Sequence, residues 1–289
     1  MEPWSDRYPD VETLRREVDA LAESFVEALL ARAPADDVRG IYLKGSARKD
    51  WASPVDYVPE LSDVDIHIFF REAADGRRRL GSASLGLEVQ AEVEQAYLRK
   101  IASPVHFPRP QLVVLNDLLE QPGCVLSPRE TVTTLYGEDY PEDAGRSEAA
   151  LREIDRTNLL AQTPYLEGFP LHVIDKPGPH ILMALRAMNW RVSPVGPRVL
   201  TVLGVPARRA WPLKRSDIIP LLREMGQSQL ADDYRDYYLA GWEHFLSGYR
   251  DSDAGRRAAA AGVRALEAGL EIAQQAAPEG EGPTAAGRP

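Results

Sequence analysis

The sequence predicts an α/β (α+β) protein, in which an N-terminal domain built on a mixed sheet precedes a C-terminal helical bundle domain. Over the first half of the chain, short apolar segments with strand character alternate with amphipathic helical segments. From about Gly145 onward only helical patterns recur, separated by Gly, Pro and Ser. Hydrophobic residues make up 44% and charged residues 27% of the chain, which is ordinary for a protein with a buried core.

The first two elements are an amphipathic helix and a buried strand. The helix is predicted over 11–32, where apolar residues recur every three or four positions, with Asp10 as its N-cap and Ala33-Pro34 at its end. A short apolar run over 38–43 indicates a strand, and it runs almost directly into Gly45-Ser46. The glycine therefore falls at a strand end.

A second strand is predicted after a segment that carries prolines and acidic residues. That segment, residues 50–62, has the composition of a surface loop. Behind it every second residue is apolar, which is the period-two pattern of a strand with one face in the core: Val64, Ile66, Ile68 and Phe70. The other face then carries Asp63, Asp65 and His67.

Three further elements complete the α/β pattern. A helix is predicted over 85–101 from its apolar side, and a strand over 112–115 after the Pro108-Arg109-Pro110 break. The capping box Ser127-Pro128-Arg129-Glu130, with proline at the first helical position, predicts a helix that ends at Gly137.

The change of pattern sets the predicted domain boundaries. The α/β catalytic domain spans 1–144, the helical domain spans 145–276, and 277–289 is predicted to be a disordered tail. Helical patterns within the second domain recur at 147–161, 179–191, 217–225, 228–247 and 254–275. One of these helices carries a cluster that we interpret as an amphipathic face, with a lining for a cationic acceptor as the alternative: Asp232, Asp233, Tyr234, Asp236, Tyr237, Tyr238 and Trp242.

Charge, cysteine and histidine content exclude several classes of protein. The formal net charge of −10 disfavours binding to nucleic acid and favours a small substrate. Cys124 is the single cysteine, so no internal disulfide forms, and the five histidines lack metal-ligand spacing. The first residues carry no basic stretch before an apolar one, and the apolar runs are short, so we expect a cytoplasmic protein with no membrane partner.

Asp63 and Asp65 are the candidate metal ligands and catalytic residues. Residues two apart on a strand project from the same face about 6 to 7 Å apart, so both carboxylates can converge on divalent cations. Mg²⁺ prefers such hard oxygen donors, keeps several waters and is commonly completed by substrate phosphates. The pair therefore indicates a magnesium site that also holds a polyphosphate. A solvated strand face is the plainer alternative for alternating acids.

Gly45-Ser46 is the candidate phosphate-binding turn. Glycine at a strand end lets the backbone approach a ligand closely, and a helix that begins there directs N–H groups at phosphate oxygens. Lys44 precedes the turn and Arg48 and Lys49 follow it, within reach of a bound phosphate, although ordinary surface charges are the alternative for Arg48 and Lys49. Such a site aligns an acceptor hydroxyl with the α-phosphorus of a nucleotide and expels pyrophosphate.

The two motifs together resemble the DNA polymerase β-like nucleotidyltransferase superfamily. They are Leu43-Lys44-Gly45-Ser46 and Ser62-Asp63-Val64-Asp65-Ile66-His67-Ile68-Phe69. A helical half after the α/β half is similar to the aminoglycoside adenylyltransferase branch, which transfers AMP from ATP to an antibiotic hydroxyl. The resemblance implies a magnesium-dependent nucleotidyltransferase, with ATP or another nucleoside triphosphate as co-substrate, a small aminoglycoside-like acceptor and a role in antibiotic resistance.

The chain departs from this family in two places. The segment between Ser46 and Asp63 is longer than is usual there, which predicts an insertion at the mouth of the site. The family's third carboxylate usually lies on the next strand, where this chain has Gln111. Either a nearby acid replaces it (Asp117, Glu92 or Glu94), or the enzyme works with two acids, or catalysis is weakened. The general base is left unassigned.

Several alternatives stay open at this point. His67 either contacts a carboxylate or substrate or packs at a strand end, and Tyr136 either lines a nucleotide pocket or is buried at a helix end. Gln111 motivates a rival from another class, an antitoxin-like binding or regulatory protein that keeps the fold without turnover. A nucleic-acid end-adding enzyme is the third possibility, which the net charge disfavours. The acceptor, the preferred nucleotide and the oligomeric state are not defined by the sequence.

Overall fold

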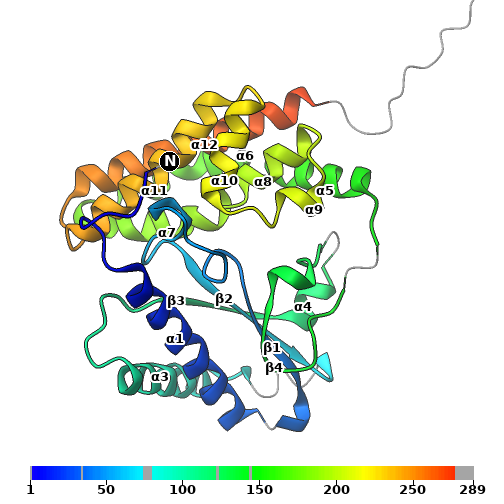
Figure 1. Ribbon diagram of the computed structural model, residues 1–289, viewed down its shortest axis with the longest axis vertical. Helices are drawn as coiled ribbons and strands as arrows, with labels where there is room; N and C mark the ends of the chain where they lie inside the picture. Colours follow the sequence, from blue (N-terminus) through cyan, green and yellow to red (C-terminus); the bar gives the residue numbers. More distant parts are fainter. Residues whose placement is uncertain (1, 34, 74–79, 122–123, 143–144, 277–289) are drawn as a thin grey trace, which may run out of the picture. The chain divides into compact units, whose positions relative to one another are not determined.

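The computed structural model describes residues 2–33, 35–73, 80–121, 124–142 and 145–276. The chain divides into two compact units, Met1–Asp143 and Ala144–Pro289, and each is described by itself (Figure 1). Within the described ranges, no helix combines the length and apolar character needed to cross a membrane. The predicted tail at 277–289 lies outside the described residues.

The first unit is built on a four-stranded mixed sheet in the order β3-β2-β1-β4. β1 (Val38–Lys44) pairs antiparallel with β2 (Asp63–Phe70) and with β4 (Thr133–Gly137). β3 (Arg109–Val114) pairs parallel with β2 and forms an edge of the sheet. The predicted α/β class with a mixed sheet is confirmed.

Two helices, α1 (Val11–Arg32) and α3 (Ala83–Lys100), pack against each other, and α1 also contacts the sheet (Figure 1). The predicted bounds of α1 are confirmed, and Asp10 is its N-cap, because the Asp10 side chain accepts a hydrogen bond from the backbone N–H of Thr13. The apolar side of α1 is buried as its periodicity predicts: Leu14, Val18, Leu21, Phe25 and Leu29.

A hydrophobic cluster of buried residues in this unit contains Tyr42, Leu115, Leu126, Val132 and Tyr140. It includes the first residue of α4 (Leu115–Leu119), a short helix that contacts β2 and β3. The side-chain amide of Asn116 pairs with both backbone groups of Phe70, at the far end of β2. This cluster holds the segments after β3 against the sheet.

The segment over 50–62 is not a surface loop, which corrects the prediction from its composition. Trp51 and every residue from Ser53 to Pro59 are buried, and a 3-10 turn, η2 (Pro54–Asp56), shapes its middle. The N–H of Ser53 donates to Asp56 Oδ2 at 3.0 Å. Because a buried carboxylate needs such a partner, this bond lets an acidic segment enter the core.

The prediction of a helix from 127 to Gly137 is also wrong. The capping-box residues form only a 3-10 turn, η3 (Arg129–Thr131), and the chain then enters β4, in which Tyr136 pairs with Ile41 of β1. Gly137 ends this strand with a φ of +79°, and a Cβ there would overlap the backbone carbonyl of Arg39. Tyr136 is therefore a half-buried strand residue rather than one at a helix end.

The second unit is helical. Its helices are α5 (Glu148–Leu160), α6 (Thr163–Ile174), α7 (Ile181–Val192), α8 (Val195–Val202), α9 (Ala207–Ala210), α10 (Arg215–Glu224), α11 (Ser228–Leu246) and α12 (Ser252–Gln275). Two further 3-10 turns are η1 (Ala35–Asp37) in the first unit and η4 (Gly178–His180) in the second. α12 packs against α11, α7, α5 and α8, so the last helix forms the centre of this unit.

The aromatic residues of the cluster on α11 form part of the helical core. Tyr234, Tyr237, Tyr238 and Trp242 are all fully buried. All three of its acids form ion pairs: Asp233 with Arg264, Asp232 with Arg223 at 2.7 Å, and Asp236 with Arg235 at 2.8 Å. The amphipathic interpretation therefore accounts for the aromatic side chains of this helix.

Candidate functional site

Two neighbouring strands present the polar residues of the candidate site. Asp63 and Asp65 lie at the start of β2, and their register partners on the parallel strand β3 are Arg109 and Gln111. Opposite partners in a sheet project on the same side, so these four side chains share one face. On the other flank of β2, Lys44 is the register partner of Asp65.

Gln111 joins the two acids. With its nitrogen turned toward them, the Gln111 amide donates to Asp63 Oδ2 at 3.1 Å and to Asp65 Oδ1 at 3.2 Å. The two carboxylates therefore converge on one small region, as the spacing of the motif predicts. Asp63 is 7% exposed and Asp65 is half-buried, so the region opens on the side of Asp65.

Arg109 is a member of this group that the sequence did not single out. Its guanidinium forms an ion pair with Asp63, and Nη2 also donates to the backbone carbonyl of Leu61 at 3.2 Å. No local pattern in the sequence points to it, because the parallel pairing of β2 and β3 places it there. Once Gln111 is placed beside Asp65, a residue two positions earlier must lie beside Asp63.

The glycine turn touches the acid pair. Gly45 has a φ of +78°, which favours glycine, and the N–H of Arg48 donates to the Gly45 carbonyl at 3.3 Å to close a turn. A Cβ at position 45 would overlap Asp65 Oδ2. The expected helix start is wrong, because 45–49 form turns and bends. Backbone N–H groups of such a turn are still able to bind an anion.

Trp51 holds this turn from the buried segment. Its indole Nε1 donates to the carbonyl of Ser46 at 3.0 Å, and its ring stacks on Tyr57 with centroids 4.2 Å apart. The guanidinium of Arg15 lies over Trp51 at 4.1 Å and donates to the carbonyl of Lys49 at 2.6 Å. Both ends of the turn are thus fixed through their backbone carbonyls.

A fully buried hydrogen-bonded chain supports Trp51 in turn. The hydroxyl of Tyr57 lies 2.9 Å from Nε2 of His106, and Nδ1 of His106 lies 2.6 Å from Oε2 of Glu17 on α1. The other carboxylate oxygen of Glu17 accepts the N–H of Val105 at 2.6 Å. These bonds satisfy the buried polar groups and tie the segment after Trp51 to α1.

The three basic residues around the turn lie in different environments. Lys44 Nζ donates to Ser127 Oγ at 3.3 Å, and Arg48 is exposed, with Nε donating to Thr133 Oγ1 at 3.3 Å. Lys49 is half-buried, and its backbone carbonyl is the one bound by Arg15. Lys44 and Arg48 therefore contact the segment that leads into β4 and the first residue of that strand.

His67 packs in the core rather than beside the acids. It is buried, and its Nδ1 lies 3.4 Å from the hydroxyl of Tyr140. Burial, with a smaller effect from Lys44, lowers the pKa of His67 to about 3. A neutral, enclosed imidazole at this position fits the packing role.

The acids considered as replacements for a third carboxylate lie elsewhere. Glu92 pairs with Arg32, which ends α1, and Glu94 accepts a hydrogen bond from Gln90 on its own helix. Asp117 is exposed on α4, which begins after the far end of β3. These three acids are not part of the group around Asp63.

The donor set suits a single divalent cation. Over the described ranges, no group of three or more His, Cys, Asp or Glu side chains could hold a metal ion. Asp63 and Asp65 nevertheless offer hard carboxylate oxygens around one region, which the Gln111 amide also reaches. Mg²⁺ tolerates few protein ligands when waters and phosphates complete its shell, so the residues fit a cation that arrives with a nucleotide.

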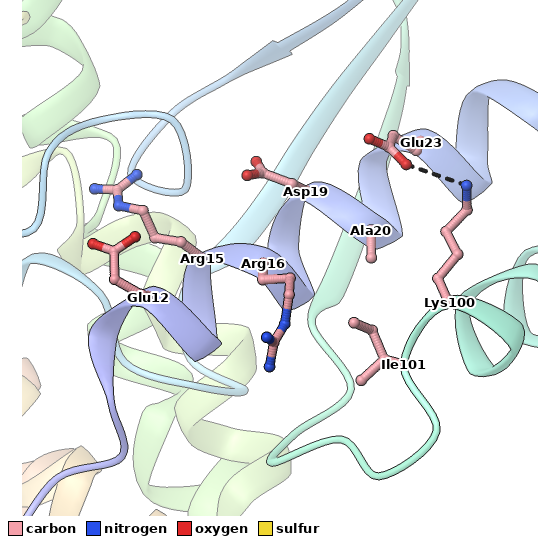
Figure 2. A pocket seen from close by; sticks show the side chains of 8 residues that line it. All are labelled: Glu12, Arg15, Arg16, Asp19, Ala20, Glu23, Lys100 and Ile101. Atoms are coloured by element: carbon pink, nitrogen blue, oxygen red, sulfur yellow. Dashed lines mark hydrogen bonds and ion pairs between the residues drawn. The ribbon is translucent and has the colours of Figure 1, made fainter.

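An open hollow of about 440 Å³ lies over α1, and its walls are seen in Figure 2. It is lined by Glu12, Arg15, Arg16, Asp19, Ala20, Glu23, Lys100 and Ile101. Charges of both signs alternate along it, and Lys100 pairs with Glu23 at 3.2 Å. None of the acids or turn residues of the candidate site belongs to this hollow.

Comparison with known proteins adds no family assignment. No family model matches the chain, and neither a curated protein nor a solved structure matches it. The residues around Asp63 and Gly45 are therefore the basis for inferring a function.

Proposed function

We propose that this protein is a magnesium-dependent nucleotidyltransferase, which transfers a nucleoside monophosphate, AMP from ATP as first choice, to a hydroxyl of a small acceptor. The observation that carries the proposal is the contact between the glycine turn and the acid pair. Asp65 lies against Gly45, and one amide reaches both carboxylates. A phosphate-binding turn and a cation site therefore adjoin each other, which is what a nucleoside triphosphate with its metal ion requires.

The residues of the site then have distinct roles. Asp63 and Asp65 hold the cation, and the cation, when bound, offsets the charge of the phosphates. Gly45 and Ser46 offer backbone N–H groups and a hydroxyl to phosphate oxygens, and the charges of Arg48 and Lys49 lie beside that turn. The oxygen of the acceptor hydroxyl attacks the α-phosphorus and its proton is released to water, while the bond to the β-phosphate breaks and pyrophosphate leaves.

The acceptor class is inferred from charge and from the helical second unit. A net charge of −10 favours cationic acceptors, of which aminoglycoside-like polyamines are the first candidates, and we assign acceptor binding to the unit after Ala144. With such an acceptor the activity confers antibiotic resistance.

Pyrophosphate release tests the proposal. The purified protein is mixed with MgCl₂, ATP and a panel of hydroxyl acceptors that includes aminoglycosides and proteins. We expect release with at least one acceptor, and a loss of at least about a hundredfold in Asp63→Asn or Asp65→Asn, since each removes a ligand charge. Asp117→Asn is the matched control, because this exposed acid lies on α4, beyond the far end of β3. Equal rates in wild type and both site variants contradict the assignment.

A second candidate is a regulatory protein that binds a nucleotide without turnover. The observation in its favour is the environment of Asp63, which is paired with Arg109 and bridged by Gln111 where the family has a third acid. It predicts magnesium-dependent ATP binding, no transfer to any acceptor, and a second protein that purifies with this one.

A further inference from the structure

Arg109 occupies an unusual position for a cation in a metal site. It is the register partner of Asp63, at the first position of β3, and its guanidinium pairs with that carboxylate. The Arg109 side chain is 24% exposed and that of Asp63 is 9% exposed, so solvent screens this pair only weakly. In the ligand-free protein, Asp63 is therefore already neutralised.

Gln111, which is exposed, bridges the two acids. Its amide donates to both carboxylates, at 3.1 Å and 3.2 Å, across the region where a divalent cation would bind. If the amide turns over, its oxygen faces the same region instead. Without a metal ion, Asp63 thus has an ion pair with Arg109 and a hydrogen bond from Gln111, and Asp65 has a hydrogen bond from Gln111.

We propose that Arg109 is a phosphate-binding residue, which pairs with Asp63 in the ligand-free protein and moves to a phosphate of the nucleotide when the nucleotide and one divalent cation bind. This inference rests on the proposed function, because it takes the ligand to be a nucleoside triphosphate. A guanidinium suits such an exchange, since its planar donors match a carboxylate and a phosphate equally well. The cation takes the carboxylate that Arg109 leaves.

Charge balance supports one cation with an arginine beside it. Two carboxylates carry a charge of −2, which one divalent cation offsets. A third acid would attract further positive charge, but this chain has the neutral Gln111 at that position. Arg109 instead supplies a permanent positive charge next to the triphosphate. A second metal ion would otherwise supply that charge.

Two binding measurements on Arg109→Gln test the proposal. Mn²⁺ binding to the protein alone is followed by electron paramagnetic resonance, and ATP binding at saturating Mn²⁺ is followed by calorimetry. We expect Mn²⁺ to bind about tenfold more tightly, because a competing charge is gone, and ATP to bind about tenfold more weakly. The matched control is Arg71→Gln, which removes a half-exposed arginine paired with Glu138 beyond the other end of β2. The control should change neither affinity.

Each other outcome has a defined meaning. If Mn²⁺ binding is unchanged or weaker in Arg109→Gln, or if ATP binding is unchanged, the proposal is overturned. If wild type binds no ATP at all, the proposed function itself is wrong. The Mn²⁺ measurements alone do not test that function. If Arg109→Gln does not fold, Arg109→Lys replaces it: a charge without the planar fork should keep Mn²⁺ affinity near wild type and still weaken ATP binding.

Discussion

The carboxylate of Asp65 lies against the α-carbon of Gly45, so that a Cβ on residue 45 would overlap Asp65 Oδ2. Position 45 also has a φ of +78°, which an L side chain rarely adopts. The close approach of strand and turn is therefore possible only with glycine.

Gly45→Ala should damage both stability and binding. The methyl group must displace either Asp65 or the turn, which we expect to cost about 1 to 3 kcal/mol of unfolding free energy. Urea unfolding measures that cost, and calorimetry measures the expected loss of ATP affinity. Gly86→Ala is the matched control, because Gly86 is an exposed residue of α3 where an added Cβ would meet no atom of another element within 4 Å. It should be neutral or stabilising by up to about 1 kcal/mol. A Gly45→Ala protein with wild-type stability and affinity contradicts this account.

Gln111→Glu should restore a third acid to the site. Three carboxylates in one region repel one another, so the thermal midpoint should fall in EDTA and rise more steeply with Mg²⁺ than it does in wild type. Thermal unfolding over a range of Mg²⁺ concentrations measures this difference. Gln111→Ala, which removes the amide without adding charge, is the control. Equal dependence on Mg²⁺ in Gln111→Glu and in wild type would falsify the placement of Gln111 beside the cation site.

Trp51→Phe tests the connection between the buried segment and the turn. Phenylalanine keeps an aromatic ring beside Tyr57 but loses the indole N–H that binds the Ser46 carbonyl. A hydrogen bond of this kind contributes about 1 kcal/mol, so ATP affinity should weaken by up to about fivefold. Trp4→Phe removes an indole bond to the Trp51 carbonyl instead, and should leave ATP affinity unchanged. Equal effects of both variants mean that the indole bond to Ser46 does not position the turn.

The buried imidazole of His67 should make stability depend on pH. Because burial lowers the pKa of His67 to about 3, the unfolded chain binds a proton below about pH 6.5 that the folded protein excludes. This group therefore destabilises the fold as the pH falls from about 6.5 toward 3, by at most about 1.4 kcal/mol per pH unit. Urea unfolding at pH 7 and pH 5 should show a smaller difference for His67→Gln than for wild type. The exposed His180→Gln is the control, and an unchanged difference in His67→Gln refutes the assignment.

Local periodicity predicted the elements that depend least on contacts with other parts of the chain. α1 has its predicted bounds because its apolar stripe and the Asp10 cap are both encoded within the helix. α6 was not predicted, since Pro164 and Pro170 weaken its pattern, and none of its residues is fully buried.

Contacts between residues far apart in the sequence explain why some elements were predicted wrongly. The capping box at 127–130 is a local helix signal, but residues after it complete the sheet beside β1, and tertiary pairing prevails over propensity. Trp51 and Tyr57 enter the core through contacts with Arg15 and His106, which lie far away in the sequence. Patterns among neighbouring residues do not reveal those contacts.

The sequence predicted that Asp63, Asp65 and Gly45 lie close together, but it did not predict that Arg109 joins them. Asp63, Asp65 and Gly45 follow from a strand pattern and a strand end. Arg109 lies between two prolines, and such a segment indicates a break in structure. Proline is nevertheless tolerated at the start of an edge strand, and β3 is one. The parallel register, rather than the sequence pattern, brings Arg109 to Asp63.

The packing of residues 51–62 has a consequence for the evolution of this chain. Between the two motifs lies a largely buried stretch, with Trp51 stacked on Tyr57 and Tyr57 joined to His106. Insertions and deletions there would disturb the interior as much as those within a helix. Alignments of homologues should therefore treat this stretch as a conserved block, with gaps placed outside it.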